Sequence, residues 1–339
     1  MNGFRRDDLT STILAPDRQF EPQALQLEIR EDPLTGHTAR ILHGANLLPS
    51  SRFDLASLAE ETRATCPFCS ERIEAVTPKL PREIAHEGRI RVGEALLFPN
   101  LLPYSQYSSV SVYSPERHFL PLEEISARLL ADNLGAQVEF ARAVTRHDSQ
   151  ATWVSINANH MLPSGSSVFH PHLQGGVNPV PTTMQRLLAT VEASRFRDYL
   201  DDERSNGERL IADTGHVTWL ASFAPIGPAE IRAFIPGIAS PVELESELVD
   251  ELAVGMATVL GVYSDLGFQS FNLALYGAPA GTDGYPLNLR LICRSNLDTL
   301  YRSDATWLER LHWETATDIA PEELALRARR RFQRASRVA

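Results

Sequence analysis

A histidine-containing segment, His170-Pro171-His172-Leu173-Gln174, closely follows the hydroxyl-rich loop Ser164-Gly165-Ser166-Ser167. In an extended chain alternate residues point the same way, so His170, His172 and Gln174 are expected on one face. Hydroxyls and exposed backbone N–H groups beside an imidazole are what a phosphoryl group in transfer requires. Two histidines in this spacing are equally typical of a strand surface, so the loop is the feature that favours chemistry.

A second signal is Cys66-x-x-Cys69, a spacing that chelates zinc. One pair supplies two of four ligands, and His118 and His170 are the natural candidates for the others. A redox pair would sit in a strand-to-helix context, whereas Cys66 lies in an irregular stretch. A pair of unligated cysteines stays open as an alternative, and Cys293, in an apolar strand, is expected in the core.

Composition excludes several classes of function. The chain has 339 residues, 43% of them apolar, and a formal net charge of −11, which argues against a nucleic-acid or membrane-surface binder. Its one lysine, Lys79, lies in Thr-Pro-Lys-Leu-Pro, so a Walker-type phosphate loop is excluded. Residues 1–20 lack the apolar core of a signal peptide, and no apolar run approaches the roughly 20 residues that cross a bilayer. We expect a soluble, cytoplasmic protein.

Apolar periodicity predicts two similar halves. Residues 1–22 have no period and are expected to form an extended or mobile arm, and residues 43–88 are irregular. The first half is predicted to hold strands at 25–29, 38–42, 90–98, 108–113 and 153–157, with a helix at 121–146. The second is predicted to hold strands at 217–223, 230–235, 270–276 and 287–293, with a helix at 241–266. Helices at 184–202 and 321–332 are expected to link the halves and to close the chain. Strand, strand, long helix, strand, strand in each half predicts a duplicated α+β unit.

Together these residues resemble one family, the galactose-1-phosphate uridylyltransferases of the histidine-triad superfamily. The resemblance runs from about Asp32 to Arg330. Its anchors are Asp32-Pro-Leu-Thr-Gly36, Cys66-x-x-Cys69, Phe98-Pro-Asn100, Ser114-Pro-Glu-Arg-His118, Asn159 ahead of Gly165-Ser-Ser167, His170-Pro-His172-x-Gln174 and Tyr276-Gly-Ala-Pro279.

The resemblance implies an α+β fold of duplicated histidine-triad-like units, whose mostly antiparallel sheet forms a half-barrel flanked by helices. It implies an arm at 1–22, a domain at 23–207 with the zinc site and the nucleophile, and a domain at 208–339 that lacks the His-x-His motif. A homodimer is also implied.

The resemblance also assigns roles to residues. It implies that zinc, the one expected cofactor, is bound by Cys66, Cys69, His118 and His170. His172 matches the nucleophile, which would form a covalent nucleotidyl-histidine, and Gln174 matches the residue that hydrogen-bonds the phosphoryl oxygens. Ser167 matches a further catalytic residue; Asn159, Gly165 and Ser166 match residues that contact substrate or orient the site.

Departures from the family pattern all concern substrate recognition. Where the family has Asn-Asp contacting the nucleoside, this chain has Asn100-Leu101. The His-x-His strand of the second half, which helps to bind a further metal, reads Asn288-Leu-Arg290 here, so that metal site is expected to be absent. Arg290 is a candidate for phosphate binding, with an ordinary sheet-surface arginine as the alternative.

These observations predict a nucleotidyltransferase that acts on a nucleoside-diphosphate sugar by ping-pong chemistry, with a sugar phosphate or phosphate as acceptor. A nucleoside-diphosphate-sugar or dinucleoside-polyphosphate phosphorylase is the alternative. A non-catalytic nucleotide-binding protein is the second alternative, and the presence of His172 beside Gln174 argues against it.

Overall fold

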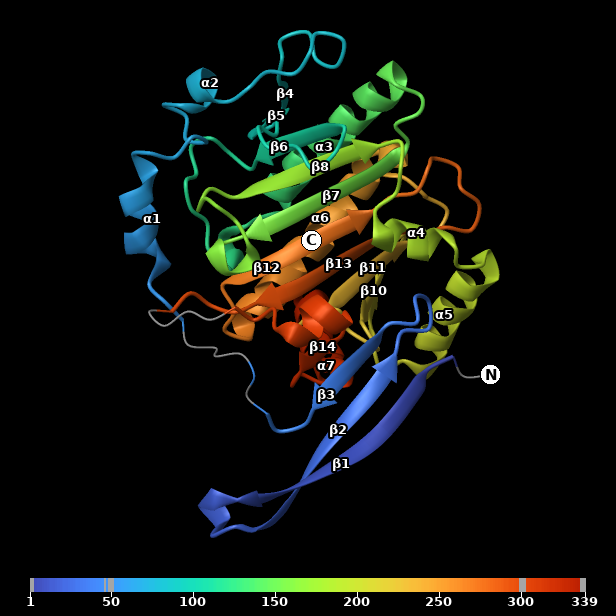
Figure 1. Ribbon diagram of the computed structural model, residues 1–339. Helices are drawn as coiled ribbons and strands as arrows, with labels where there is room; N and C mark the ends of the chain where they lie inside the picture. The colour runs from blue at the N-terminus through green and yellow to red at the C-terminus, as the bar shows by residue number, and fades with distance from the viewer. Residues whose placement is uncertain (1–2, 46, 48–51, 299–302, 336–339) are drawn as a thin grey trace.

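A ten-stranded antiparallel sheet forms the centre of the molecule in the computed structural model, which describes residues 3–45, 47, 52–298 and 303–335 (Figure 1). Its strands run in the order β4 (Ile90–Val92), β5 (Ala95–Pro99), β6 (Tyr107–Val112), β8 (His172–Asn178), β7 (Trp153–His160), β12 (Ser270–Tyr276), β13 (Leu287–Arg294), β11 (Ile231–Ile235), β10 (Thr218–Ala221) and β9 (Leu210–Asp213). The sheet stays open. This confirms the predicted α+β class and the mostly antiparallel half-barrel.

The two halves of this sheet repeat one topology in mirror order. The first half reads β5-β6-β8-β7 and the second β12-β13-β11-β10, and β7 pairs with β12 where they meet. Helix α3 (Ala127–His147) connects β6 to β7, as α6 (Ser246–Asp265) connects β11 to β12. The predicted duplication is therefore visible in the strand order.

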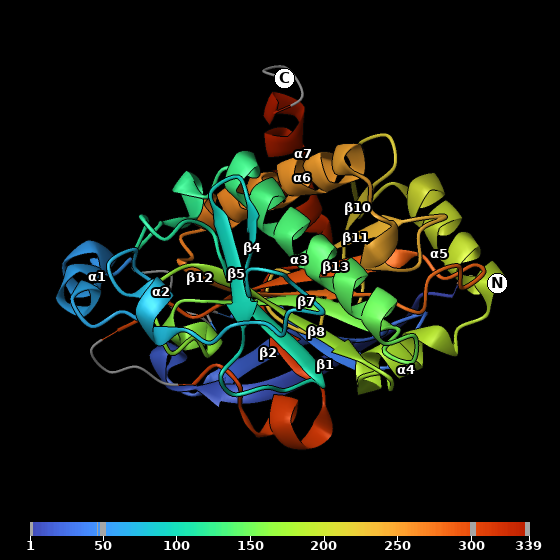
Figure 2. The ribbon, with the colours of Figure 1, turned by 90° about the horizontal axis from the view of Figure 1, so that it is seen from above.

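Helices α3 and α6 cover one face of the sheet (Figure 2). Ser126 caps the start of α3, because its side chain accepts a hydrogen bond from the Leu129 N–H. One apolar core lies between these helices and the sheet, and both halves supply it, for example Leu130 and Leu173 from the first and Trp219 from the second. In the described part of the chain, no long helix covers the opposite face of β8, β7 and β12 (Figure 1).

A close contact fixes the position of β8 against α3. The Gln137 side chain of α3 reaches β6, where it accepts a hydrogen bond from Ser109 Oγ at 2.9 Å. A Cβ on Gly175 of β8 would lie 2.1 Å from Gln137 Oε1, so only glycine fits beside this side chain. The glycine next to Gln174 thus lets the strand that carries the histidines lie directly on α3.

A smaller sheet lies against the second half. It has the order β1 (Arg5–Ala15), β2 (Glu21–Glu31), β3 (Thr38–Leu42) and β14 (Thr315–Thr317). The expected arm is a strand: β1 pairs with β2 along its whole length and is exposed on both faces. No alternation marked it in the sequence because neither face of this strand is buried.

Other boundaries also differ from those expected. The predicted strand 90–98 is a hairpin, because a turn at Gly93 separates β4 from β5. The predicted helix 184–202 is two helices, α4 (Thr183–Ala189) and α5 (Ala193–Asn206). The long helix of each half starts after a short helical turn, at Leu122–Glu124 and Pro241–Glu243. The remaining α-helices among the described residues are α1 (Leu55–Arg63), α2 (Ile73–Val76) and α7 (Pro321–Ala335).

Among the described residues, no helix combines the length and the apolar character needed to cross a membrane.

Candidate functional site

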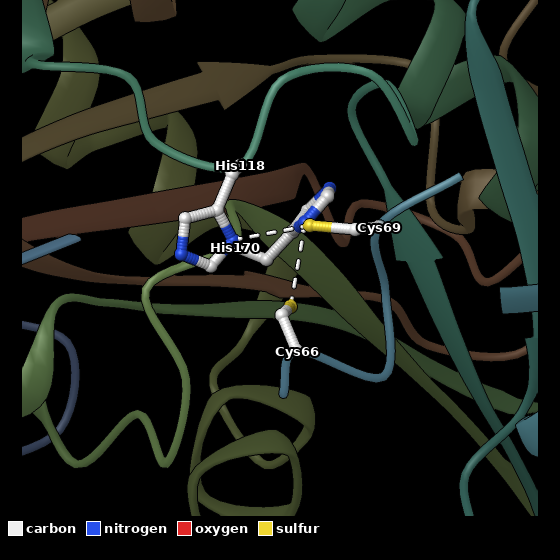
Figure 3. Close-up of side chains that lie close together, drawn as sticks. All are labelled: Cys66, Cys69, His118 and His170. Carbon is white, nitrogen blue, oxygen red and sulfur yellow. Dashed lines mark hydrogen bonds between the residues drawn. The ribbon is translucent and has the colours of Figure 1, made fainter. Parts of the chain in front are cut away.

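Four potential metal ligands meet beside the start of β8 (Figure 3). Cys66 and Cys69 come from the loop between α1 and α2, His118 from the loop after β6, and His170 from the segment that enters β8. One ligand atom from each lies within 4.8 Å of all the others, and all four residues are buried. The structure thus brings together the four residues expected to bind zinc.

The distances between these atoms fit a tetrahedral metal. Cys69 Sγ lies 3.3 Å from His118 Nδ1 and 3.7 Å from His170 Nδ1, and Cys66 Sγ lies 3.7 Å from His170 Nδ1. Tetrahedral zinc with bonds of about 2.3 Å to sulfur and 2.0 Å to nitrogen separates the two by roughly 3.5 Å. A metal ion could therefore bind here with little movement of the ligands.

Hydrogen bonds turn both imidazoles toward the cluster. Nε2 of His118 lies 2.9 Å from the Ala59 carbonyl, and Nε2 of His170 lies 2.9 Å from that of Ser114. A carbonyl can only accept, so each Nε2 carries the proton and each Nδ1 presents its lone pair to the cluster. Burial lowers the pKa of His170 to about 3 and also lowers that of His118, which keeps both rings neutral.

The ionisation of the two thiols depends on whether a cation is bound. Burial, together with the neighbouring Cys66, raises the pKa of the Cys69 thiol to about 12. A divalent cation between the two sulfurs would reverse this effect, because it stabilises the thiolates that bind it. The donor set of two cysteines and two histidines fits zinc, and four protein ligands make a closed, structural type of site.

His172 opens β8 with a defined ring orientation. Its Nδ1 lies 2.9 Å from the His170 carbonyl, so Nδ1 carries the proton and Nε2 carries the lone pair. In the described part of the chain, Nε2 has no hydrogen-bond partner. The ring of Phe68 packs against that of His172 in a T-shaped arrangement, with 5.4 Å between the ring centroids. Burial lowers the pKa of His172, with partial compensation by the hydrogen bond to His170. A neutral imidazole with an open Nε2 is a competent nucleophile.

Polar side chains continue this face across the sheet. Gln174 follows His172 by two residues on β8 and therefore points the same way; opposite it on β7 stands Asn157. Asn159 is two residues further along β7, on the same face. Within the described residues, the Gln174 side-chain amide makes no hydrogen bond, so it is available to a ligand.

The loop before β8 presents backbone and hydroxyl groups beside Asn159. Gly165 has φ +95°, which favours glycine, and a Cβ there would lie 3.9 Å from Asn159 Nδ2. Ser166 is buried and its hydroxyl donates to the Val168 carbonyl at 2.7 Å, which shapes the loop. Ser167 is exposed, and its hydroxyl has no partner among the described residues.

Two further candidates lie apart from this group. Asn100 follows β5; its N–H donates to Ser108, the residue opposite Gly176 of β8, and its side chain accepts from the Leu102 N–H. Arg290 is only 2% exposed, and its Nη1 donates to Glu230 Oε1 at 2.9 Å. The guanidinium thus pairs with a buried carboxylate through Nη1, while its buried Nε and Nη2 have no hydrogen-bond partner among the described residues.

Comparison with known proteins places the chain in a family. No family model matches it. An uncharacterized protein of Archaeoglobus fulgidus is 32% identical over 329 residues, which are 95% of this chain and 96% of that protein. The chain belongs to the same family as this archaeal protein.

Solved structures identify the fold. An ADP-glucose phosphorylase from Arabidopsis thaliana, solved with bound ADP-glucose, superposes with a TM-score of 0.66 at 18% identity, over 89% of this chain and 98% of the other. A uridylyltransferase superposes with a TM-score of 0.60 at 20% identity, over 90% and 98%. The chain therefore has the same fold as these two enzymes.

Within this uridylyltransferase-like fold, the second half adds a residue that the sequence analysis missed. Asn272 of β12 stands opposite Asn159 of β7 and donates a hydrogen bond to its side chain. Its signal was the one side-chain amide in the largely apolar strand 270–276. His160, by contrast, lies on the other face of β7, stacked on Phe271, where burial lowers its pKa to about 3.

Proposed function

We propose that this chain is a nucleotidyltransferase that acts on a nucleoside-diphosphate sugar or a similar donor through His172. The observation that carries the proposal is a neutral His172 whose Nε2, like the side-chain amide of Gln174 on the same face, has no hydrogen-bond partner among the described residues; Asn159 lies near both. The likeness to an ADP-glucose phosphorylase and a uridylyltransferase supports the class of reaction. A binding protein would not need a nucleophile in this position.

In the first step, His172 Nε2 attacks the α-phosphorus of the donor. The N–P bond forms as the bond from that phosphorus to the bridging oxygen breaks, and the sugar 1-phosphate leaves with the electron pair. The resulting imidazolium keeps its proton on Nδ1, where the His170 carbonyl stabilises it. In the second step an oxygen of the acceptor attacks the same phosphorus, and the N–P electrons return to Nε2.

The other residues of the site act on the phosphoryl group. The Gln174 amide and the Ser167 hydroxyl can donate hydrogen bonds to its oxygens as charge develops there. We propose that Gly165, Ser166 and Asn159 form the phosphate-contacting loop and that Asn100 contacts the nucleoside. Zinc bound by Cys66, Cys69, His118 and His170 would supply no reactive group; it would hold the entry to β8 in place.

The acceptor is either a sugar phosphate or inorganic phosphate. Asn288 and Arg290 are 0% and 2% exposed, so neither side chain can contact a sugar bound on this face. This supports phosphorolysis as the second candidate, because phosphate is a smaller acceptor.

The remaining assignments are proposals of the same kind. We propose a first domain at 23–207 that carries the chemistry and a second at 208–339 that completes the sheet. We further propose a homodimer that works in the cytoplasm.

Intact-protein mass spectrometry tests the reaction. The protein is incubated briefly with a panel of nucleoside-diphosphate sugars and dinucleoside polyphosphates and kept alkaline, because a phosphoramidate on histidine is acid-labile. We expect a mass gain of one nucleoside monophosphate, which also identifies the base. His172→Asn should abolish the mass gain while the protein keeps its metal. The control His147→Asn, at an exposed histidine that ends α3, should keep both the mass gain and the metal.

Adding acceptors to the labelled enzyme separates the two candidates. Loss of the label to a hexose 1-phosphate indicates a transferase, and loss to inorganic phosphate indicates a phosphorylase. A label that persists in His172→Asn, or the absence of label from every donor with the metal bound, contradicts the mechanism.

A further inference from the structure

A chain of hydrogen bonds leads from the second half of the molecule to the phosphate-contacting loop of the first. Its centre is Asn272, whose Nδ2 lies 2.6 Å from Asn159 Oδ1 and 3.0 Å from the Ser164 carbonyl. The other atom of the same amide, Oδ1, accepts a hydrogen bond from Arg294 Nη1 at 2.7 Å. One side chain therefore contacts both the amide of Asn159 and the backbone of the loop.

The arginine decides which way the Asn272 amide points. A guanidinium has only donors, so the atom of Asn272 that faces Arg294 must be the oxygen. The nitrogen must then face Asn159, and because that nitrogen donates, Asn159 must present its own oxygen to it. The NH2 group of Asn159 then faces Gly165: a Cβ built on Gly165 would lie 3.9 Å from Asn159 Nδ2.

Arg294 is itself held by a buried carboxylate. Its Nε donates to Asp304 Oδ2 at 2.8 Å and its Nη2 contacts Oδ1, while the Ser295 N–H also donates to Asp304 at 2.8 Å. The Asp304 side chain is 3% exposed. Burial raises the pKa of Asp304, but these hydrogen bonds outweigh it and the pKa is lowered. The chain of contacts thus ends in a fixed charge pair.

We infer that Asn272 is a positioning residue, which sets the Asn159 amide so that its NH2, and not its carbonyl, faces the transferring phosphoryl group. Phosphoryl oxygens accept hydrogen bonds, so the reversed amide would place lone pairs against them. The same nitrogen of Asn272 holds the loop at the Ser164 carbonyl. This inference rests on the proposed function and adds to it a contribution of the second half of the chain to the site.

Asn272→Asp tests the direction of the amide at constant size. The introduced carboxylate still accepts from Arg294 but has no N–H, so Asn159 must reverse its amide to donate to it. We expect nucleotidyl transfer to His172 to slow by about 10²-fold, the usual effect of losing one donor to a developing charge. Asn178→Asp is the matched control. Among the described residues, the Asn178 side chain at the end of β8 only accepts a hydrogen bond, from the Gln106 N–H, so the rate of this variant should stay within about threefold of wild type.

A double-mutant cycle separates positioning from general structure. If Asn272 acts chiefly through Asn159, most of the effect of Asn272→Asp should disappear in an Asn159→Ala background, and what remains is the loss of its hydrogen bond to the Ser164 carbonyl. Asn272→Ala, which leaves the Asn159 amide free to rotate, should cost about tenfold alone and again little in that background. An undiminished effect in the Asn159→Ala background, or wild-type rates in both single variants, overturns the inference.

Equilibrium binding keeps this test independent of the reaction. Binding of inorganic pyrophosphate to the His172→Asn protein is measured by calorimetry, with and without the Asn272 substitutions. The positioning role is supported if the Asn272 substitutions weaken pyrophosphate binding and if this weakening largely disappears in the Asn159→Ala background. This result counts even if no donor labels the wild type. Unchanged binding together with unchanged labelling rates overturns it.

Discussion

Substitution of one cysteine should release the metal and loosen the start of β8. Structural zinc with four ligands contributes about 10–16 kcal/mol of apparent binding free energy, or about 3 kcal/mol for each ligand if shared evenly. The four ligand atoms already lie within 4.8 Å of one another, so little of this is lost to rearrangement. For Cys66→Ser we therefore expect a metal affinity about 10²-fold lower and a melting temperature lower by about 5 °C or more.

Elemental analysis of the purified protein, together with calorimetry, measures both effects. The matched control is Cys293→Ala, because Cys293 is fully buried in β13 and is not among the four ligands. Its cavity should lower the melting temperature by a comparable few degrees, yet the protein should keep about one metal ion per chain. The reasoning is refuted if Cys66→Ser retains a full equivalent of zinc, or if folded wild-type protein contains none.

Two predictions concern buried charge. Arg290→Met leaves Glu230 without the guanidinium that lies 2.9 Å away, which should cost about 3–5 kcal/mol in urea unfolding; adding Glu230→Gln should recover most of the loss, and no recovery would show that the pair is not coupled. Glu322 is partly desolvated, which raises its pKa, but the hydrogen bond from Arg30 outweighs this and lowers the pKa from 4.5 to about 2. The stabilisation by ionised Glu322 is therefore present above pH 4.5 and lost as the pH falls toward 2. In Glu322→Gln, the free energy of unfolding should fall by about 2 kcal/mol less than in the wild type between about pH 5 and pH 2, after screening is allowed for. An equal fall in both proteins would contradict this.

The site could be predicted from the sequence where its geometry is local. The two-residue period of a strand places His172 and Gln174 on one face, and that period survives in β8. Cys66 and Cys69 lie three residues apart, so their shared ligation is also a local matter. His118 joins them only because the loop after β6 returns beside β8, and the resemblance to a family supplied that information, since spacing alone does not.

What the sequence could not show depends on distant partners. Arg290 was expected either at a phosphate or on the sheet surface, but it is buried because Glu230 supplies a carboxylate from the neighbouring β11 loop. Asn272 and Asn159 are brought opposite each other by the β7–β12 pairing, across more than a hundred residues of chain. The strand β1 has no buried face to impose a pattern. Each of these features is decided by long-range pairing, which periodicity does not record.

The mirror order of strands about the β7–β12 pair has a consequence for how the two halves tolerate change. Two identical half-length chains that paired edge to edge would need the same residues on both sides, because every substitution would appear twice. A single continuous chain is free of that symmetry. In this chain β8 carries the reactive imidazole of His172, whereas β13, its counterpart in the second half, carries Arg290, which forms a buried ion pair with Glu230. We therefore expect random substitutions to be tolerated unequally at the related positions: at His172 they should abolish reactivity, and at Arg290 they should mainly lower stability.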